Sequence, residues 1–258
     1  MVTARADHEI AHGKELVKGD PALTWGWGTP AGRLRAIRRA EMIASGAHLR
    51  SGIRVLEIGC GTGIFTEMFA QTGAEIVAVD ISADLLKVAK ARDLSVAGVQ
   101  FLERRFEECD VDGPFDAVIG SSVLHHLDLE SALPRILTLL KPAGVMSFAE
   151  PNMLNPQVFI ERKLSFLPCF WYVSPDETAF IRRRLRSVLK RFGFEKIEVK
   201  PFDWLHPATP ARLIYAVRSV ARILEKVPII REFAGSLYIR CRRPNRNDQI
   251  NLNDNLCP

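Results

Sequence analysis

The segment VLEIGCGTG, residues 55–63, constrains the fold more than any other part of the sequence. Its first four residues are apolar apart from Glu57, and they predict a buried strand. Gly59, Gly61 and Gly63 then alternate with other residues, so the chain turns sharply and leaves its backbone open to a ligand. The sequence therefore predicts a strand that is followed directly by a ligand-binding turn.

Other apolar runs repeat the strand pattern along the chain. We predict strands at 53–58, 75–80, 99–102, 115–120 and 144–149. Helical patterns lie between them, at 64–71, after a capping Ser82, and at 129–140 with Pro134 in or near the first turn. This alternation predicts a parallel sheet with helices on both faces. Two late strands, 193–202 and 235–243, are expected to form an antiparallel edge pair.

The size and composition of the chain suit one folded domain with insertions. It has 258 residues, of which 47% are hydrophobic and 25% charged. We expect an N-terminal helical lid or cap (1–50), a central domain (51–243) and a polar, disordered tail (244–258). Two insertions in the central domain, 151–176 and 201–234, are expected to form substrate-binding or lid elements.

The N-terminus and the cysteines indicate the compartment. The N-terminal residues MVTARADHEIAHGKE contain no apolar segment after the charges, so we expect no secretory signal and a cytoplasmic location. The five cysteines are widely spaced and form no CxxC pair, which argues against a disulfide framework and against a zinc site. We therefore expect reduced thiols and no bound metal.

A net charge of +5 and a pI near 9.1 would suit an anionic partner. The densest basic run is RRRLR at 182–186, within a helix predicted over 176–192 whose apolar residues would face inward. A solvated helix face explains this run, and no base-reading motif accompanies it. We therefore do not expect nucleic acid as a partner.

A second basic helix is predicted over 211–227. Its apolar residues recur at steps of four and three, at Leu213, Val217, Val220, Leu224 and Val227. The charges on this helix exclude a transmembrane span. The pattern fits peripheral contact with a membrane surface, or packing against the protein's own sheet or a second subunit, and we favour packing. Both a monomer and a homodimer remain open.

Two classes of ligand use a glycine loop after the first strand. Dinucleotide enzymes have GxGxxG beside a pyrophosphate, whereas this loop is GxGxG preceded by Glu57. A carboxylate there would repel a pyrophosphate and attract a ligand with a cationic arm. Asp80 ends the next strand, seventeen residues after Gly63, where a carboxylate can bind both hydroxyls of a ribose. The expected ligand is a nucleoside with a cationic arm.

Four ordered motifs between residues 53 and 151 resemble those of the class I S-adenosylmethionine-dependent methyltransferases. They are VLEIGCGTG, VAVDIS, FDAVIGSSVLHHL and LLKPAGVMSFAEP. The resemblance implies an α/β fold with a Rossmann-like seven-stranded, mostly parallel sheet, an antiparallel last strand, helices on both faces and lid insertions. It also implies S-adenosylmethionine as the cofactor and methyl transfer to an O or N atom of a small-molecule acceptor.

The family pattern implies a role for individual residues of these motifs. Glu57 would meet the methionine ammonium group directly or through water, and Asp80 would bind the ribose hydroxyls. The other implied cofactor contacts are the backbone of the glycine loop, residues around the adenine and residues beside the sulfonium: Gly59, Cys60, Gly61, Gly63, Ile81, Leu85, Phe106, Gly120 and Ser121. Arg105 departs from the pattern, because the family often has an acidic residue there for the adenine amino group. The backbone amide of Phe106 could still bind the adenine ring.

Methyl transfer needs a positioned acceptor, exclusion of water and, for a hydroxyl or amine, a base. His125 and His126 follow the fourth predicted strand, and Glu150 ends the fifth at the same sheet edge. We predict a catalytic base among these histidines, with Glu150 as the acid that orients it. In many members of the family the histidine pair only packs and caps a helix, so a structural role is the alternative.

The sequence says less about the acceptor. Methyltransferases that modify nucleobase amines carry an Asn or Asp, two prolines and an aromatic residue after the fourth strand. This chain has GSSV at 120–123, so we expect a small molecule. Trp25 and Trp27, before a helix predicted over 32–47, could cover the ligands or anchor that helix. SFLPCFWY at 165–172 lies where family members insert substrate-recognition elements.

Two segments after the fifth predicted strand also resemble parts of other methyltransferases. EPNMLNPQ and SPDETAF, at 150–157 and 174–180, resemble segments of bacterial methyltransferases associated with glycan or secondary-metabolite pathways. A lipid-linked acceptor would give the basic helix at 211–227 a purpose. The main alternative is a non-catalytic S-adenosylmethionine-binding regulatory protein, and a dehydrogenase is a more distant one.

Overall fold

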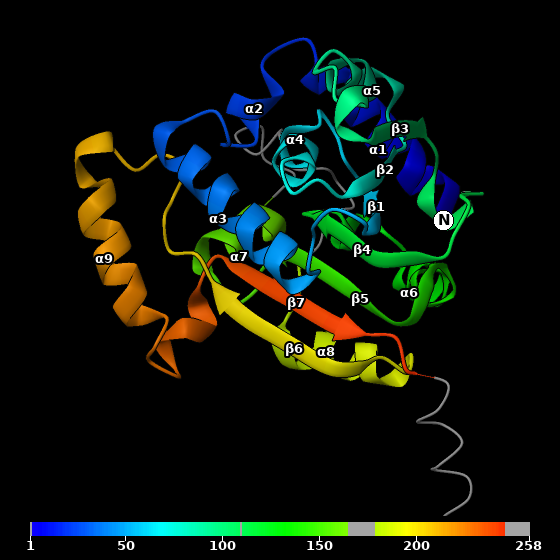
Figure 1. Cartoon of the computed structure of the whole chain (residues 1–258). Helices are drawn as coiled ribbons and strands as arrows, with labels where there is room; N and C mark the ends of the chain where they lie inside the picture. The colour runs from blue at the N-terminus through cyan, green and yellow to red at the C-terminus, as the bar shows by residue number, and fades with distance from the viewer. Residues whose placement is uncertain (1, 109, 165–178, 246–258) are drawn as a thin grey trace, which may run out of the picture.

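Seven strands form one mixed sheet among the residues that the computed structural model describes, 2–108, 110–164 and 179–245 (Figure 1). They are β1 (Arg54–Ile58), β2 (Glu75–Asp80), β3 (Val99–Glu103), β4 (Phe115–Ser121), β5 (Leu140–Pro151), β6 (Glu195–Phe202) and β7 (Ser236–Arg242). Their order in the sheet is β3-β2-β1-β4-β5-β7-β6. Only β7 runs antiparallel to its neighbours, β5 and β6. The predicted fold class is confirmed.

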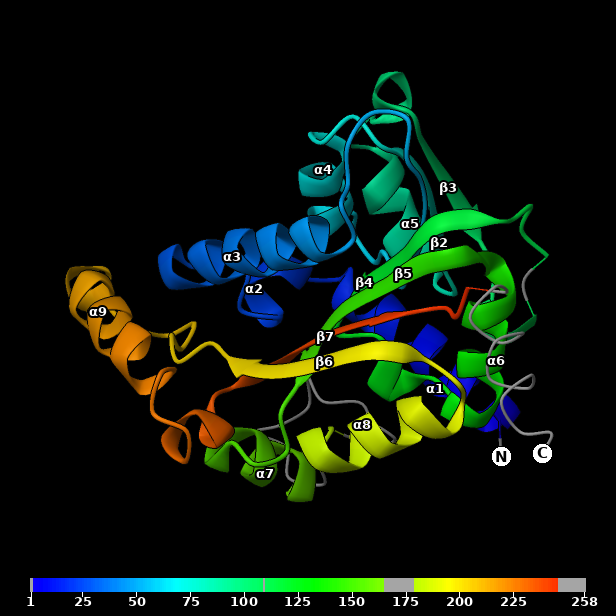
Figure 2. The ribbon, with the colours of Figure 1, turned by 60° about the horizontal axis from the view of Figure 1, so that its bottom comes forward.

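Helices cover both faces of this sheet (Figure 2). Their bounds are α1 (Val2–Leu16), α2 (Pro21–Thr24), α3 (Pro30–Gly46), α4 (Ile64–Ala70), α5 (Ala83–Lys90), α6 (Leu129–Leu139), α7 (Pro156–Lys163), α8 (Arg182–Arg191) and α9 (Ile214–Leu224). Helices α3, α4 and α5 share one apolar cluster with the sheet, and α6 and α8 share another. Both faces are therefore covered, as expected for parallel strands with almost continuous apolar sequences.

Neighbouring residues of β1 show how one apolar run serves two cores. Val55 packs in the cluster that contains Ile43 of α3 and Phe69 of α4. Leu56 points the other way, into the cluster that contains Leu133 of α6 and Leu185 of α8. Because side chains alternate across a strand, this strand must be apolar throughout, which is how the sequence revealed it.

The predicted N-terminal cap of α5 is confirmed, because it depends only on residues that are close in the sequence. The Ser82 hydroxyl accepts a hydrogen bond from the Leu85 amide at 3.3 Å, so Ser82 begins α5 as predicted. Pro134, in contrast, lies inside α6 and not in its first turn. The helix tolerates it because Pro134 and Glu130 are exposed, so water can bind the Glu130 carbonyl that loses its amide donor.

Helix α8 begins later than predicted, and only part of the apolar stripe predicted for α9 is buried. The helix predicted over 176–192 begins at Arg182, and the SFLPCFWY segment and the tail from 246 lie outside the described residues. On α9, Ile214 and Ala221 are buried, whereas Leu213 and Val220 of the predicted apolar stripe are exposed. The predicted stripe is thus split, because Val217 and Leu224 are partly buried while other members face away from the protein.

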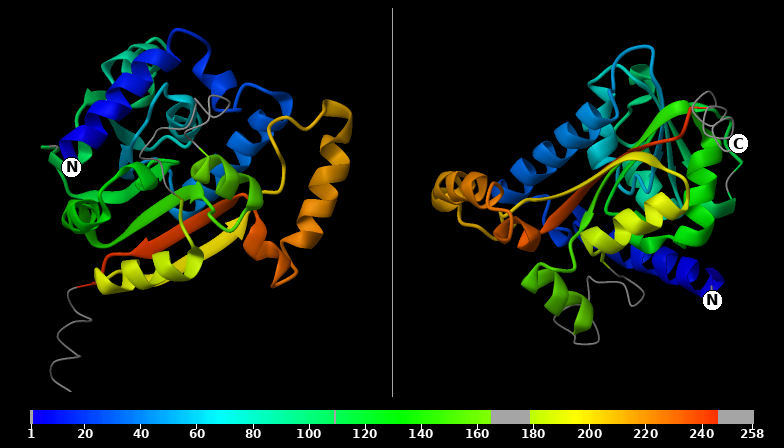
Figure 3. Two further views of the ribbon diagram at one scale, coloured as in Figure 1. Left: turned by 180° about the vertical axis from the view of Figure 1, so that it is seen from behind. Right: turned by 90° about the horizontal axis from the view of Figure 1, so that it is seen from below.

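The N-terminal helix α1 lies within the segment 1–50 that was expected to be a helical lid or cap, although no separate bounds were predicted for it. It packs on α5, where Gly13 approaches Ser82 and Leu85 so closely that an added Cβ would lie 2.4 Å from the Ser82 hydroxyl oxygen. Viewed from behind and from below, α1 and α9 lie at opposite sides of the molecule (Figure 3). Among the described residues, no helix has the length and apolar character needed to cross a membrane.

Candidate functional site

A cavity of about 860 Å³ opens at the carboxyl ends of the parallel strands. Its walls include the glycine loop, the end of β2, α1 and the segment 203–207. The predicted site residues that line it are Gly59, Cys60, Gly61, Asp80, Ile81, Leu85, Arg105, Phe106, Ser121 and His126. Those that do not line it are Glu57, Gly63, Gly120, His125 and Glu150. One cavity thus brings together most of the predicted residues.

The glycine loop has the backbone that its sequence requires. Gly59, Gly61 and Gly63 have φ values of 67°, 52° and 75°, in the left-handed region. A Cβ on Gly59 would lie 2.3 Å from a methyl carbon of Val123, so glycine is needed there for space as well. Burial and nearby carboxylates raise the pKa of the Cys60 thiol well above its ordinary value. Cys60 therefore presents a neutral thiol and its backbone.

The Asp80 carboxylate fastens this loop to the next strand. Its Oδ2 accepts a hydrogen bond from the Gly61 amide at 2.7 Å, and its Oδ1 accepts one from the Ser82 amide at 2.9 Å. Burial raises the pKa of Asp80, and these two hydrogen bonds oppose the shift. The carboxylate lines the cavity at the end of β2, so its remaining lone pairs can accept from a ligand.

Glu57 lies deeper than the sequence suggested. Its side chain is 1% exposed and its Oε2 has no hydrogen-bond partner among the described residues. Burial raises its pKa to about 8, with a contribution from the charge of Asp80, while the Thr66 hydroxyl opposes the shift. A ligand in the cavity would therefore reach this carboxyl group through an intervening water.

Apolar side chains and α1 enclose the part of the cavity beyond Asp80. Ile81, Leu85 and the buried Phe106 line this part together with Glu9 and His12 of α1. A lid was expected over 1–50, but no individual site residue was predicted in α1, because it is a polar sequence whose role depends on its contacts with α5. Within α1, Gly13 marks a point at which this helix closely approaches α5.

Arg105, the residue that departs from the family pattern, also lines the cavity. Its guanidinium lies 2.9 Å from Glu108 and 3.7 Å from Glu107. The arginine is thus paired with acids of its own turn. These acids balance its positive charge, and the apolar lining of this part of the cavity comes from neighbouring residues.

The two adjacent histidines occupy different environments. His125 is buried, and its Nδ1 lies 2.6 Å from Oε2 of Glu150. The other oxygen of Glu150 accepts hydrogen bonds from the amides of Val123 and Leu124, both at 3.0 Å. Burial would raise the pKa of Glu150, but these hydrogen bonds and the His125 charge hold it below its usual value. This pair fixes the turn after β4.

His126 is the histidine that faces the cavity. Its Nδ1 lies 3.0 Å from Oε1 of Glu9, and its ring packs against His125 with 4.1 Å between centroids. Both rings are thus constrained, but only His126 borders the ligand space. A carboxylate beside Nδ1 favours the tautomer in which Nε2 can accept a proton.

Arg39 of α3 joins the strand ends beneath the cavity and was not predicted to do so. Its guanidinium is buried and donates to the Ser122 hydroxyl at 2.8 Å, the Ala149 carbonyl at 3.0 Å and the Ser236 hydroxyl at 2.5 Å. Burial, with the charge of Arg35, lowers its pKa to about 10. The N-terminal segment is thereby tied to β5, β7 and the turn after β4.

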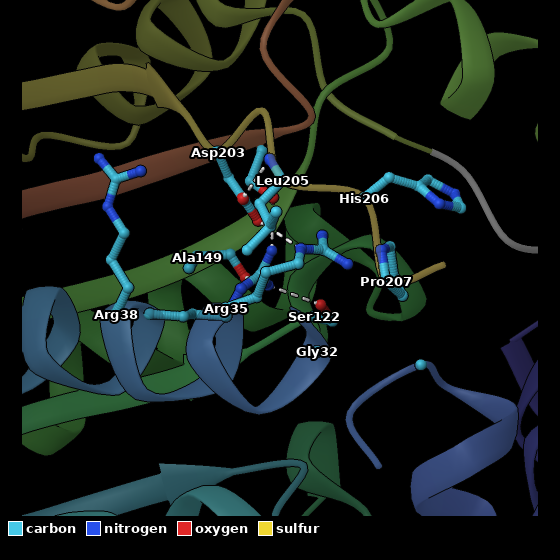
Figure 4. Close-up of polar contacts among 12 residues, drawn as sticks. Gly32, Arg35, Arg38, Ser122, Ala149, Asp203, Leu205, His206 and Pro207 are labelled. Carbon is cyan, nitrogen blue, oxygen red and sulfur yellow. Dashed lines mark hydrogen bonds and ion pairs between the residues drawn. The ribbon is translucent and has the colours of Figure 1, made fainter. Parts of the chain in front are cut away.

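Arg35, one helical turn earlier, borders the other end of the cavity. Its Nε lies 2.7 Å from Oδ2 of Asp203, in the loop that also carries His206 and Pro207 (Figure 4). The Trp27 ring lies 5.3 Å from the Arg35 guanidinium and 5.4 Å from that of Arg39. The four-residue spacing of these arginines beside two tryptophans was the signal that could have identified this end of the cavity.

The fold and the site define a class of protein. A sheet of this order has a glycine loop after β1 and a carboxylate that ends β2, so it belongs with the α/β proteins that bind a nucleoside at the carboxyl edge. Sequence comparison narrows the class, because the profile of a methyltransferase domain matches residues 55–144.

Curated relatives agree with that match. A ubiquinone biosynthesis O-methyltransferase of Bordetella avium (strain 197N) is 32% identical over 205 residues, which cover 72% of this chain and 84% of that protein. Its counterpart in Rhodopseudomonas palustris (strain BisB5) is 35% identical over 119 residues, covering 45% of this chain and 47% of that protein. The match thus spans about half the length of several such relatives. The chain belongs to the class I S-adenosylmethionine-dependent methyltransferase family.

Solved structures share the fold at low sequence identity. The N-methyltransferase NodS from Bradyrhizobium japonicum WM9, in complex with S-adenosyl-L-homocysteine, superposes with a TM-score of 0.62. The alignment covers 92% of this chain and 98% of that one at 16% identity. At this identity the likeness shows the fold alone.

The buried carboxyl group of Glu57 should make stability depend on pH. A pKa raised from 4.5 to about 8 means that the folded protein retains a proton that the unfolded chain releases, so stability falls as the pH rises through this window. We expect the wild type to lose about 2–4 kcal/mol between pH 5 and pH 9, and the Glu57→Gln variant to lose less than about 1 kcal/mol. Urea unfolding measured across this pH range checks the prediction.

The matched control is Glu103→Gln, at an exposed position of β3, which should keep the wild-type slope. Parallel pH profiles for the wild type and Glu57→Gln would contradict the assignment of a raised pKa to Glu57.

Proposed function

We propose that the protein is an S-adenosylmethionine-dependent methyltransferase that acts on a small-molecule acceptor. The observation that carries the proposal is the Asp80 carboxylate, which lines the cavity while it holds the glycine loop through Gly61. Ile81 and Leu85 give the cavity an apolar wall beside this acid, which suits a ribose next to an adenine. Relatives named as O-methyltransferases support the same activity.

The residues of the cavity fit this cofactor. Asp80 would bind the ribose hydroxyls, and Phe106 with its apolar neighbours would surround the adenine. The glycine loop would lie along the methionine arm, and the orphaned oxygen of Glu57 would face its ammonium group through a water. When bound, S-adenosylmethionine would supply a methyl group on a positively charged sulfur that leaves as a neutral thioether.

Residues at the other end of the cavity would bind the acceptor. Trp27, Arg35, Trp204 and His206 line this end, while Ser121 at the end of β4 lies between the two ends. The tryptophans and the N-terminal segment 1–50 would act as a lid that excludes water and holds the acceptor in line with the methyl group. Because the curated relatives are named as O-methyltransferases, we propose a hydroxyl as the acceptor group.

His126 is the proposed catalytic base. It lines the cavity, and Glu9 lies beside its Nδ1, so the imidazole is oriented for Nε2 to take the proton of an acceptor hydroxyl. His125 and Glu150 are proposed as positioning residues, since they hold the turn from which His126 projects. Of the two histidines, His126 would thus contact the acceptor and His125 would not.

Calorimetry with S-adenosylmethionine tests the cofactor site. We expect Asp80→Asn to weaken binding by at least about tenfold, because a charge-assisted hydrogen bond to the ribose is lost. The matched control is Asp84→Asn on the outer side of α5, which should bind like the wild type. An analogue that lacks the 3′-hydroxyl should lose affinity for the wild type and little further affinity for Asp80→Asn.

Comparing the two ligands on the wild type and on Asp80→Asn separates the ribose contact from the structural role of Asp80 in the loop. Equal losses with the analogue in both proteins would contradict the ribose contact. Binding of the cofactor without formation of S-adenosylhomocysteine on any hydroxyl or amine acceptor would favour the non-catalytic regulatory protein instead.

Replacement of His126 tests the base. With a panel of phenolic and aliphatic alcohols, we expect His126→Gln to lower kcat by about 10²–10⁴ while the affinity for S-adenosylmethionine stays unchanged. His125→Gln should instead lower the melting temperature, because it breaks the buried pair with Glu150. Formation of S-adenosylhomocysteine and thermal unfolding are the two measurements. Full turnover by His126→Gln would exclude this residue as the base.

A further inference from the structure

The segment between β6 and β7 leaves and returns at the edge of the sheet that holds the cavity. Phe202, Ser236 and Pro151 are register partners, so the end of β6 lies level with the end of β5. The first residues of the segment, 203–207, line the acceptor end of the cavity, and α9 follows directly. In Figure 1, α9 stands at one side of the molecule, next to α3. This helix is therefore attached to the wall of the site.

The acidic residues of the segment are used to fix it to the protein body. Glu225, just after α9, accepts two hydrogen bonds from Arg38 of α3, at 2.6 and 2.8 Å. Glu232 pairs with Arg182 of α8 at 2.9 Å. Together with the buried Ile214, these contacts set which side of α9 faces inward.

The opposite side of α9 exposes a stripe of apolar residues. Ala216, Val220, Ile223 and Val227 recur at steps of four, three and four, which places them on one face of a helix. Val220 is 53% exposed and Ile223 is 64% exposed. Exposed apolar residues also continue beyond the helix, at Ile229, Ile230 and Phe233. So much exposed apolar surface on one segment indicates a partner.

A basic stripe runs along another exposed side of α9. Arg218, Arg222 and Lys226 are spaced by four residues and exposed, and Arg212 lies just before the helix. Within the described part of the chain, none of these four cations forms an ion pair. The outer face of α9 therefore combines apolar surface with uncompensated positive charge.

We propose that the outer face of α9, with Ile229, Ile230 and Phe233, docks on the surface of a membrane that contains anionic phospholipids. Apolar side chains would enter the boundary between headgroups and acyl chains, and the arginines would contact the phosphate groups. A second copy is a poorer occupant, because a two-fold contact through α9 would bring two helices with uncompensated positive charge close together. From the sequence we favoured packing of this helix against the protein's own sheet or a second subunit over contact with a membrane surface; the exposure of Val220 and Ile223 favours the membrane surface.

Docking through α9 would bring the loop 203–207 close to the bilayer surface. An acceptor with a lipid tail could then reach the cavity without leaving the membrane entirely. This consequence rests on the proposed methyltransferase function, whereas the docking surface itself does not.

Co-sedimentation with lipid vesicles tests the docking surface. We expect the full chain to bind vesicles of phosphatidylcholine with phosphatidylglycerol and to bind pure phosphatidylcholine much more weakly, with loss of binding in high salt. The variants Arg218→Glu/Arg222→Glu and Val220→Asn/Ile223→Asn should each weaken binding by at least about tenfold. The matched control is Arg183→Glu/Arg186→Glu on the exposed face of α8, which changes the net charge equally and should weaken binding less than about threefold.

Three outcomes would overturn the proposal. They are no binding to anionic vesicles, an equal loss in the α8 control, and a concentration-dependent dimer that Val220→Asn/Ile223→Asn dissociates. Thermal unfolding and calorimetry with S-adenosylmethionine on each variant show whether the fold and the cofactor site are intact. Failure of the docking surface can thus be told apart from failure of the proposed function.

Discussion

The carboxylate of Asp80 is the interaction on which the site depends. It joins the glycine loop after β1 to the first turn of α5 through two short hydrogen bonds from backbone amides. Gly59 and Gly61 have positive φ angles, which let the loop turn so that the Gly61 amide reaches that acid. The same oxygens border the cavity, so one side chain both shapes the loop and presents acceptors to a ligand.

A second buried charge organises the opposite side of the cavity. Arg39 reaches from α3 to the turn after β4 and to the facing ends of β5 and β7. Burial of a guanidinium is costly unless its donors are used. Here Nη1 and Nη2 of Arg39 donate to hydroxyl and carbonyl oxygens, whereas Nε has no hydrogen-bond partner among the described residues. The N-terminal residues are therefore part of the site's construction. An active site built partly from this segment suits a reaction that needs a closed, dry space.

The fold could be predicted from the sequence because each of the first five strands contains a short apolar run with a glycine or an acid at or near its carboxyl end. Asp80 followed from the same regularity, since parallel strands end at one edge. The histidines show the limit of this reasoning. His125 and His126 are adjacent in the sequence, and only the hydrogen bond to Glu150 decides that the first is buried. Glu57 was placed at the right strand end, but its depth depends on packing with Thr66 that no local pattern encodes.

The surface helix shows a different limit. Its sequence contains two overlapping apolar stripes, one through Ile214 and Ala221 and one through Val220 and Ile223. Periodicity alone cannot choose between them, because both fit a helix. The ion pair between Arg38 and Glu225, which joins residues far apart in the sequence, determines which stripe faces inward. Tertiary contacts of this kind also explain why the cavity-lining residues of α1, Glu9 and His12, were not predicted.

The central claim is that this cavity selects a positively charged sulfur nucleoside over a dinucleotide. Competition calorimetry on the wild-type protein tests it directly, by titration of S-adenosylmethionine with and without NADH. We predict saturable binding of S-adenosylmethionine at a single site, which NADH does not weaken even in large excess. Binding of NADH in the cavity, together with no detectable binding of S-adenosylmethionine, would contradict this account.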